Sequence, residues 1–283
     1  MFTDKTNAHI THAHRGARGY APENTMPAFH KALELKAEAL ELDVNLTKDG
    51  VAVIYHDYVL TRTTNIAELP ALQKKGEKTG IHDLTLEEVR TLDAGKWYME
   101  NDPFEQIKEG TVSKETAAGF VGTRIPTLEE LLAFIKESGM LLNLEIKDQT
   151  EIGDQSHTIV HTVLEHIRKF DVKNQTMISS FNHDYLKTIH EEMPEMPLGV
   201  LTEERIEQPV EYCKKLHAAA YHPCRRFTTS DDIKALHEAG MLVNIWTINC
   251  EHELHTFANW GTNGLISDFP DRARTAIQNV SSS

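Results

Sequence analysis

Short runs of apolar residues alternate along the chain with longer stretches in which apolar positions recur every three or four residues. The short runs are typical of buried strands, and the longer period is typical of amphipathic helices. The pattern predicts strands near residues 10–14, 39–46, 51–56, 140–146, 176–180, 197–201, 218–222, 241–247 and 264–267. It predicts helices near residues 26–36, 127–138, 156–169, 183–193, 206–216, 229–239 and 251–259.

This strand–helix alternation favours an α/β fold with a parallel sheet. About eight strand–helix units match a TIM-type (β/α)8 barrel, which usually has about 250 residues; the alternative is a doubly wound open sheet. Residues 57–122 break the rhythm, because they are mostly polar and contain one clear helix, at 85–93. We therefore expect residues 1–283 to form a single barrel domain, with 57–122 as a small insertion after the third strand.

Several helix boundaries carry start signals. Thr127 and Glu130 have the spacing of a capping box. Asn24 or Thr25 is expected to cap the first helix. Asp268, near the end of the last strand, either orients a neighbouring group or caps the last helix, with a proline just inside it, and we favour the cap.

Residues 41–57 read ELDVNLTKDGVAVIYHD, in which Asp49-Gly50 between two apolar-rich runs predicts a β-hairpin. With these two residues as the turn, Lys48 pairs with Val51 and Asp43 lies opposite His56. One face of the hairpin is then polar and carries Glu41, Asp43 and His56. The other face is then apolar and carries Leu42, Val44, Leu46, Val51, Val53 and Tyr55.

The stretch LLNLEIK, residues 141–147, shows the same alternation. Its leucines and isoleucine share one face, while Glu145 and Lys147 share the other. A charged face near the carboxyl end of a strand is where barrel active sites are built. Glu41, Asp43 and Glu145 together offer oxygen ligands for a hard divalent cation, Mg²⁺ or Ca²⁺.

His14 and Arg15 stand side by side where the first strand is expected to end. Arg15 and Lys147 could hold an anionic group beside the cation. His14 and His56 are then placed for general acid–base work. A metal site, two cationic side chains and two imidazoles together point to phosphoryl chemistry.

Composition narrows the possible partners. Lys and Arg number 29 against 43 Asp and Glu, a net charge of −14, which argues against nucleic acid but leaves room for a small phosphorylated substrate. The cysteines, Cys213, Cys224 and Cys250, have no metal or redox spacing. We see no signal peptide and no run that would span a bilayer, so we expect a cytoplasmic protein.

The chain resembles the compact bacterial glycerophosphodiester phosphodiesterases. The matching motifs follow the family's order over almost the whole chain, with the weakest match in the middle of the insertion and from 197 to 230. They are His14-Arg15-Gly16, Pro22-Glu23-Asn24-Thr25, Glu41-Leu42-Asp43-Val44, Thr47-Lys48-Asp49-Gly50, His56-Asp57, Ile125-Pro126-Thr127-Leu128-Glu129-Glu130, Asn143-Leu144-Glu145-Ile146-Lys147, Ser179-Ser180-Phe181, Trp246-Thr247 and Ser267-Asp268-Phe269-Pro270.

The resemblance implies a TIM-type barrel that hydrolyses glycerophosphodiesters to sn-glycerol 3-phosphate and an alcohol, with one divalent cation, Mg²⁺ or Ca²⁺. It implies a small-molecule substrate and no stable association with a membrane. His12 departs from the family, which usually has an apolar residue there, and we expect it to be a packed, inward-facing histidine. The roles implied are metal ligation by Glu41, Asp43 and Glu145, acid–base catalysis by His14 and His56, and substrate binding by Arg15, Lys147 and Trp246.

Two other functions are weighed against this one. A lysophospholipase D, or a phospholipase C-like enzyme that cleaves a lipid phosphodiester, would need an apolar rim, but the insertion is acidic and polar around Glu105 to Glu115. A sensor or carrier without catalysis would lack a ligand or a histidine, and the motifs are complete. The nucleophile stays open between water and the glycerol 2-hydroxyl. The preferred alcohol, which histidine is the base, and the oligomeric state also stay open.

Overall fold

The computed structural model describes residues 9–281 and contains a closed ring of eight parallel strands. Pairing runs in the order β1-β10-β9-β8-β7-β6-β5-β2, and β1 pairs with β2 to close the ring. This is the TIM-type barrel expected from the alternation, and not an open sheet. The strands are β1 (Ile10–His14), β2 (Ala39–Leu46), β5 (Leu141–Ile146), β6 (Thr176–Ser180), β7 (Leu198–Thr202), β8 (Ala220–Pro223), β9 (Leu242–Ile245) and β10 (Gly264–Ser267).

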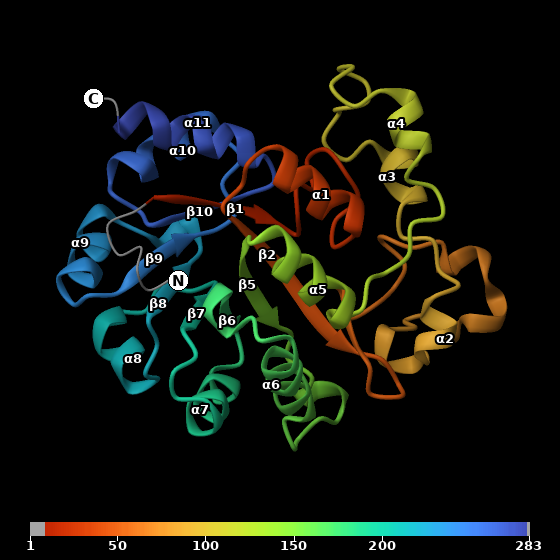
Figure 1. Cartoon of the computed structure of the whole chain (residues 1–283), viewed down its shortest axis with the longest axis horizontal. Coiled ribbons are helices and arrows are strands. Elements are labelled where there is room, and N and C mark those ends of the chain that lie inside the picture. Colours follow the sequence, from red (N-terminus) through yellow and green to blue (C-terminus); the bar gives the residue numbers. More distant parts are fainter. Residues whose placement is uncertain (1–8, 282–283) are drawn as a thin grey trace.

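Helices surround the ring, and each barrel strand is followed by one of them (Figure 1). One of these, α5, begins with the expected capping box, in which the side chain of Thr127 accepts from the backbone N–H of Glu130. The surrounding helices are α1 (Met26–Glu34), α5 (Leu128–Ser138), α6 (Thr158–Phe170), α7 (His183–Glu192), α8 (Pro209–Lys215), α9 (Ser230–Glu238), α10 (Glu251–Asn259) and α11 (Pro270–Ser281). Short 3₁₀ turns η5 (Thr150–Ile152), η6 (Lys173–Gln175) and η7 (Arg225–Phe227) lie in the connections.

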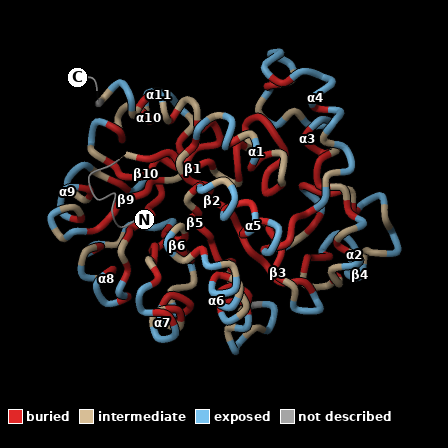
Figure 2. The backbone as a smooth tube through the Cα atoms, viewed as in Figure 1, coloured by how far each residue is buried: buried red, intermediate tan, exposed pale blue. Residues whose placement is uncertain are grey.

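Each barrel strand has two chemically different faces. In β5, Leu142, Leu144 and Ile146 are buried in the main apolar core between the ring and the helices. The residues between them, Asn143 and Glu145, point into the ring because side chains alternate along a strand. Figure 2 shows the ring as almost continuously buried, so the polar side chains inside it are held away from bulk water.

The predicted hairpin is present, but its register differs by one residue. Strand β3 (Ala52–Ile54) pairs antiparallel with β2, with Val44 opposite Ile54. Thr47 therefore faces Val51, and residues 48–50 form a three-residue loop in which Gly50 adopts a left-handed φ of +78°. A glycine in this conformation is typical of three-residue hairpins. The two-residue turn and the Lys48–Val51 and Asp43–His56 pairs were thus wrong.

Because the register differs by one residue, the side chains of β3 pack in other cores than the prediction implied. Ala52 and Ile54 belong to the main core, whereas Val53 and Tyr55 pack in a second core with the insertion. His56 still reaches the ring interior, since β3 ends at Ile54 and the chain leaves the pairing before it.

The insertion after β3 lies on one side of the barrel, next to α1 and α5 (Figure 1). Its own apolar core includes Leu60, Ile66 and Leu84. The hydroxyl of Tyr98 donates to the backbone oxygen of Gly19 over 2.7 Å and ties the insertion to the loop after β1. The helix expected at 85–93 is shorter than predicted. The elements are η2 (Ile66–Glu68), η3 (Pro70–Leu72), β4 (Lys74–Glu77), η4 (Ile81–Asp83), α2 (Leu86–Val89), α3 (Lys96–Asn101) and α4 (Lys114–Ala118).

A buried polar layer crosses the ring interior and contains His12. Nε2 of His222 lies 2.8 Å from the side-chain nitrogen of Asn244. Gly264 makes room for the layer, because a Cβ there would lie 2.2 Å from the Asn244 side-chain oxygen and 2.7 Å from Nε2 of His12. Burial lowers the pKa values of His12 and His222 to about 3, so both rings are neutral at pH 7.

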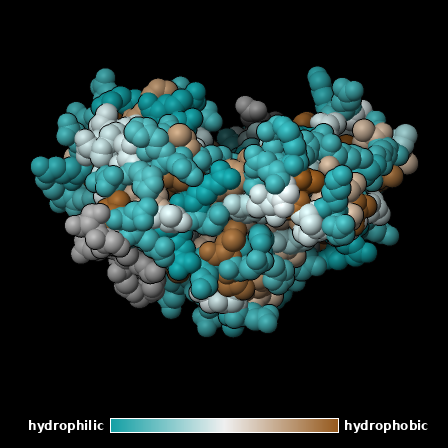
Figure 3. Space-filling model, turned by 90° about the horizontal axis from the view of Figure 1, so that it is seen from above, coloured by the Kyte–Doolittle hydropathy of each residue, from teal (hydrophilic) through white to brown (hydrophobic). Residues whose placement is uncertain are grey.

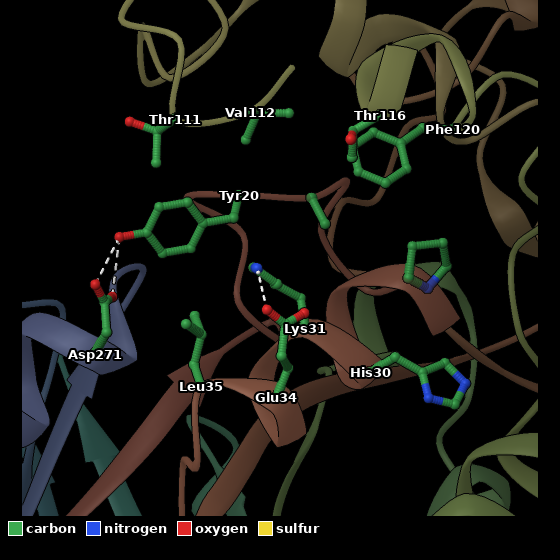
Figure 4. A pocket seen from close by; sticks show the side chains of 12 residues that line it. Tyr20, His30, Lys31, Glu34, Leu35, Thr111, Val112, Thr116, Phe120 and Asp271 are labelled. Atoms are coloured by element: carbon green, nitrogen blue, oxygen red, sulfur yellow. Dashed lines mark hydrogen bonds and ion pairs between the residues drawn. The ribbon is translucent and has the colours of Figure 1, made fainter. Parts of the chain in front are cut away.

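A cavity of about 490 Å³ lies between α1 and the insertion (Figure 4). Thr111, Val112 and Phe120 of the insertion face Tyr20 across it, and the Tyr20 hydroxyl donates to the Asp271 carboxylate at 2.9 Å. This cavity shares no lining residue with the barrel cavity described below.

The face seen in Figure 3 is mainly hydrophilic, and hydrophobic residues gather on it in small groups. Among the helices of residues 9–281, none has both the length and the apolar character needed to cross a membrane.

Candidate active site

Three carboxylates meet at the carboxyl end of two neighbouring strands. Glu41 and Asp43 lie on β2 and Glu145 on β5, and the parallel register pairs Asp43 with Glu145. One oxygen from each residue lies within 4.8 Å of the other two, and all three side chains are buried. In the described part of the chain, this is the one group of three or more potential metal ligands that comes together so closely.

The crowding of negative charge alters the pKa values of this cluster. Burial, together with Asp43 and Glu145, raises the pKa of Glu41 well above its usual range. Burial also raises the pKa of Glu145, even though Lys147 opposes it. Burial would also raise the pKa of Asp43, but its interactions with His56, Arg15 and Lys147 hold that pKa below the usual range. Three buried carboxylates with surplus negative charge are a donor set that fits Mg²⁺ or Ca²⁺.

His14 is held by a carboxylate at the other end of the chain. Ring closure places β10 beside β1, and Nδ1 of His14 lies 2.6 Å from Oδ1 of Asp268. Asn249 donates to the other oxygen of Asp268 over 2.6 Å. Nε2 of His14 faces Glu41 at 3.9 Å. Burial lowers the pKa of His14 to about 4, although Asp268 acts in the opposite direction.

His56 has the same arrangement with its neighbour in sequence. Nδ1 of His56 lies 2.6 Å from Oδ1 of Asp57. Arg62 donates to both oxygens of Asp57, at 2.6 and 3.0 Å. Burial alone would raise the pKa of Asp57, but His56 and Arg62 bring it to about 2. In both histidines, Nδ1 is occupied by a carboxylate, which leaves Nε2 for the cavity.

Arg15 and Lys147 bring positive charge to the carboxylates. Nζ of Lys147 lies 2.6 Å from Glu145 and 3.8 Å from Asp43. Arg15 adopts a left-handed φ of 53°, and its Nε lies 3.5 Å from Asp43. That Nε is buried and has no hydrogen-bond partner among the described residues. A buried donor without a partner is costly, so this position suits an anionic ligand.

The side chains surround a cavity of about 590 Å³. Trp246 forms part of its wall and packs edge-to-face on Phe181, with ring centroids 5.6 Å apart. Asp43 is buried beside the cavity without lining it. The structure therefore gathers all eight predicted site residues in one place: His14, Arg15, Glu41, Asp43, His56, Glu145, Lys147 and Trp246.

Two predicted helix caps turn out to be part of the site. Thr25 occupies the N-cap of α1 without a side-chain bond to the helix, and Asn24 donates to Asp43 over 2.9 Å instead. Asp268 binds His14 and Asn249 rather than acting as the expected cap. These residues bind through long-range contacts, which the local pattern of a helix start does not reveal.

No role was predicted for Glu23 or Arg62, which bind each other and connect to the site through further carboxylates and guanidinium groups. Glu23 stands in the matching motif Pro22-Glu23-Asn24-Thr25, but the motif by itself does not reveal its arginine partners. A positional signal existed for Asp268. It follows the last predicted strand, and the closure of a barrel places that strand beside the first.

Comparison with known proteins gives one consistent result. Residues 14–272 match the model of the glycerophosphoryl diester phosphodiesterase family. A glycerophosphodiester phosphodiesterase of Bacillus altitudinis is 35% identical over 92% of this chain and 95% of its own. One of Caldanaerobacter subterraneus subsp. tengcongensis is 32% identical over 92% of this chain and 93% of its own.

A solved structure supports the same assignment. A phosphodiesterase of Oleispira antarctica, in complex with its product sn-glycerol 3-phosphate, is 28% identical, with a TM-score of 0.80, and the match covers 95% of this chain and 96% of that one. Fold, site and sequence agree, and the chain belongs to the glycerophosphoryl diester phosphodiesterase family.

Proposed function

We propose that this protein hydrolyses glycerophosphodiesters to sn-glycerol 3-phosphate and an alcohol, with a divalent cation and a pair of histidines. One observation carries the proposal: two carboxylate-bound imidazoles, two cationic side chains and a cluster of three carboxylates, of which Glu41 and Glu145 line the cavity, gather at one place. The names of the relatives and the product bound to the Oleispira antarctica enzyme support the same substrate class. We further propose that the barrel and its insertion act as one catalytic domain.

Glu41, Asp43 and Glu145 would hold one cation, Mg²⁺ or Ca²⁺, because their buried oxygens lie close enough to share it. When bound, such a cation neutralises charge on a phosphoryl oxygen and orients the substrate. The raised pKa of Glu41 fits this use, since surplus negative charge favours a positive ligand.

The phosphate group binds beside this cluster. Nε of Arg15 faces Asp43 at 3.5 Å without a hydrogen bond, and Lys147 reaches the same carboxylate from the end of β5. Both side chains neutralise phosphate oxygens, and the planar guanidinium of Arg15 also orients the group.

His14 and His56 move the protons. Each holds its Nδ1 on a carboxylate, which fixes the ring orientation and presents Nε2 to the cavity. One imidazole removes the proton of the nucleophile, and the other protonates the alkoxide that leaves. Trp246 and Phe181 form the wall against which an organic part of the substrate packs.

The test is release of sn-glycerol 3-phosphate from glycerophosphocholine and from glycerophosphoethanolamine. It is run in EDTA and again after Mg²⁺ or Ca²⁺ is restored. Turnover that EDTA abolishes and a cation restores supports the proposal. Absence of product with both substrates and both cations contradicts it.

A further inference from the structure

A network of hydrogen bonds and ion pairs lies next to the cavity and connects the carboxylates that hold the two histidines. We propose that Glu23 is a positioning residue that, through Arg18 and Arg62, fixes Asp268 and Asp57. The inference rests on the proposed function, because it concerns how the two histidines are held for that reaction.

The first branch of the network runs from Glu23 to His56. Arg62 donates to both oxygens of Glu23, over 2.6 and 2.9 Å. The same guanidinium donates to both oxygens of Asp57, over 2.6 and 3.0 Å. Asp57 in turn lies 2.6 Å from Nδ1 of His56. One planar guanidinium thus clamps two carboxylates at fixed angles, which a lysine ammonium does not do.

The second branch runs from Glu23 to His14, and Arg18 contributes ion pairs to it, because its buried Nε has no hydrogen-bond partner among the described residues. One nitrogen of Arg18 lies 3.3 Å from Glu23, and its Nε lies 3.6 Å from the Asp268 oxygen that contacts His14. Both branches have the same order of groups, from Glu23 through an arginine and an aspartate to an imidazole. Glu23 is the residue they share.

A third contact joins Glu23 to the phosphate-binding side, where Arg15 donates to it over 2.8 Å. Burial alone would raise the pKa of Glu23, but Arg15, Arg62 and Arg18 hold it well below its usual range. The side chain is 3% exposed, so one buried carboxylate, ionised at pH 7, binds three guanidinium groups. With Asp57 and Asp268, the network contains three carboxylates against three guanidinium groups.

Glu23, Arg18 and Arg62 do not line the barrel cavity. They act on the substrate only through Arg15, His14 and His56, which do line it. Their effect is therefore on the placement of the groups that react, and removing the network loosens both imidazoles at once. Losing a partner that orients such groups typically costs about 10- to 100-fold in activity.

The experiment compares Glu23→Gln, Arg62→Ala, Arg62→Lys and the double variant Glu23→Gln/Arg62→Ala with the wild type. The control is Arg90→Ala, also in the insertion, whose side chain is 39% exposed against 41% for Arg62 and whose partner is Glu130. For each protein we would measure kcat and KM for glycerophosphocholine, the affinity for sn-glycerol 3-phosphate and the melting temperature.

We expect Glu23→Gln to lower kcat by about 10- to 100-fold and to weaken product binding, since it releases both branches and Arg15. Arg62→Ala should lower kcat by about tenfold, and added guanidinium chloride, but not sodium chloride, should restore part of it. Arg62→Lys should have a lower kcat than Arg62→Ala with added guanidinium, because a lysine keeps the positive charge but cannot bind both carboxylates in the fixed geometry of a guanidinium group. In the double variant, the loss should be smaller than the product of the single losses.

The proposal is overturned by kcat values within twofold of wild type in Arg62→Ala. It is also overturned by a loss that guanidinium does not relieve, or by additive losses in the double variant. Should Glu23→Gln not fold, the two Arg62 variants decide alone, because that side chain is partly exposed. A wild type without turnover instead contradicts the proposed function, whereas an active wild type matched by every variant contradicts only the network.

Discussion

Nδ1 of His14 lies 2.6 Å from Oδ1 of Asp268, although the two residues are 254 positions apart in the chain. His56 makes the same contact, at the same distance, with the residue that follows it. Each imidazole thus has a carboxylate on its Nδ1. For His14 this carboxylate comes from a distant residue that ring closure brings near, and for His56 it comes from the next residue in the chain. A carboxylate on Nδ1 selects the tautomer that leaves Nε2 for proton transfer and stabilises the ring when it becomes charged.

Asp268→Asn should lower kcat for glycerophosphocholine by about 100-fold, because the amide keeps the shape but neither selects the tautomer nor stabilises an imidazolium. Rates of sn-glycerol 3-phosphate release measure the effect. The matched control is Asp271→Asn, which removes a carboxylate that binds Tyr20 outside the cavity. An unchanged kcat in Asp268→Asn would mean that the contact has no part in catalysis.

His14→Ala and His56→Ala should each lower kcat by about 100-fold or more, which is the usual contribution of general acid–base help. KM should change less, since Arg15 and Lys147 remain in place to bind the phosphate. Steady-state kinetics at saturating cation separates the two constants. Near wild-type kcat in either variant would remove that histidine from the mechanism. His255→Ala, on the outer helix α10, serves as the control.

Added Mg²⁺ or Ca²⁺ should raise the melting temperature of the EDTA-treated protein, because a ligand that binds the folded state stabilises it by about 2.7 kcal/mol at 100 times its Kd. Asp43→Asn and Glu145→Gln should lose most of this rise. Glu203→Gln, at the edge of the same cavity but outside the cluster, should keep it. An equal rise in all variants would place the cation elsewhere.

The free energy of unfolding should fall as the pH drops below about 6.5. Burial lowers the pKa values of His12 and His222 to about 3 in the folded protein, against 6.5 for an ordinary histidine. Between these values each of these two histidines binds a proton in the unfolded chain but not in the folded one, and His14, with its pKa lowered to about 4, adds to the same trend. Each histidine therefore costs about 1.4 kcal/mol of stability per pH unit.

Urea unfolding at pH 7.5 and 5.5 measures this loss. His12→Leu should lose about half of the pH dependence attributed to this pair, whatever its stability at pH 7.5. The exposed His252, changed to Asn, should leave the pH dependence as it is. A pH dependence in His12→Leu equal to that of the wild type would contradict the assignment.

Much of this architecture follows from local patterns. The strands of the ring were predicted because each is a short apolar run between turn signals, as in β5, where leucine and isoleucine alternate with Asn143 and Glu145. The same alternation identified the polar faces on which Glu41, Asp43 and Glu145 meet. The parallel register of β2 and β5 then brings these three carboxylates together.

The remaining features depend on contacts that have no local signature. The register of the hairpin differs from the predicted one by one residue because Gly50 closes a three-residue loop. A shift of one residue places every side chain of β3 on the face opposite to the predicted one. Asn24 and Asp268 carry the composition of helix caps, yet stronger partners, Asp43 and His14, take their side chains. Contacts between distant segments outweighed local preference in these places.

The β1–β10 pairing also has a consequence for the timing of biosynthesis. A nascent chain on the ribosome presents His14 first, and Asp268 follows only after 254 further residues have been made. Contacts over such separations form late in folding, because a long loop must close first. Until β10 docks, β1 can pair with β2 alone and keeps one open edge that invites aggregation, and Nδ1 of His14 has no carboxylate partner. Under the proposed function, catalytic competence therefore requires that β10 has docked on β1, and enzyme activity reports that the ring has closed.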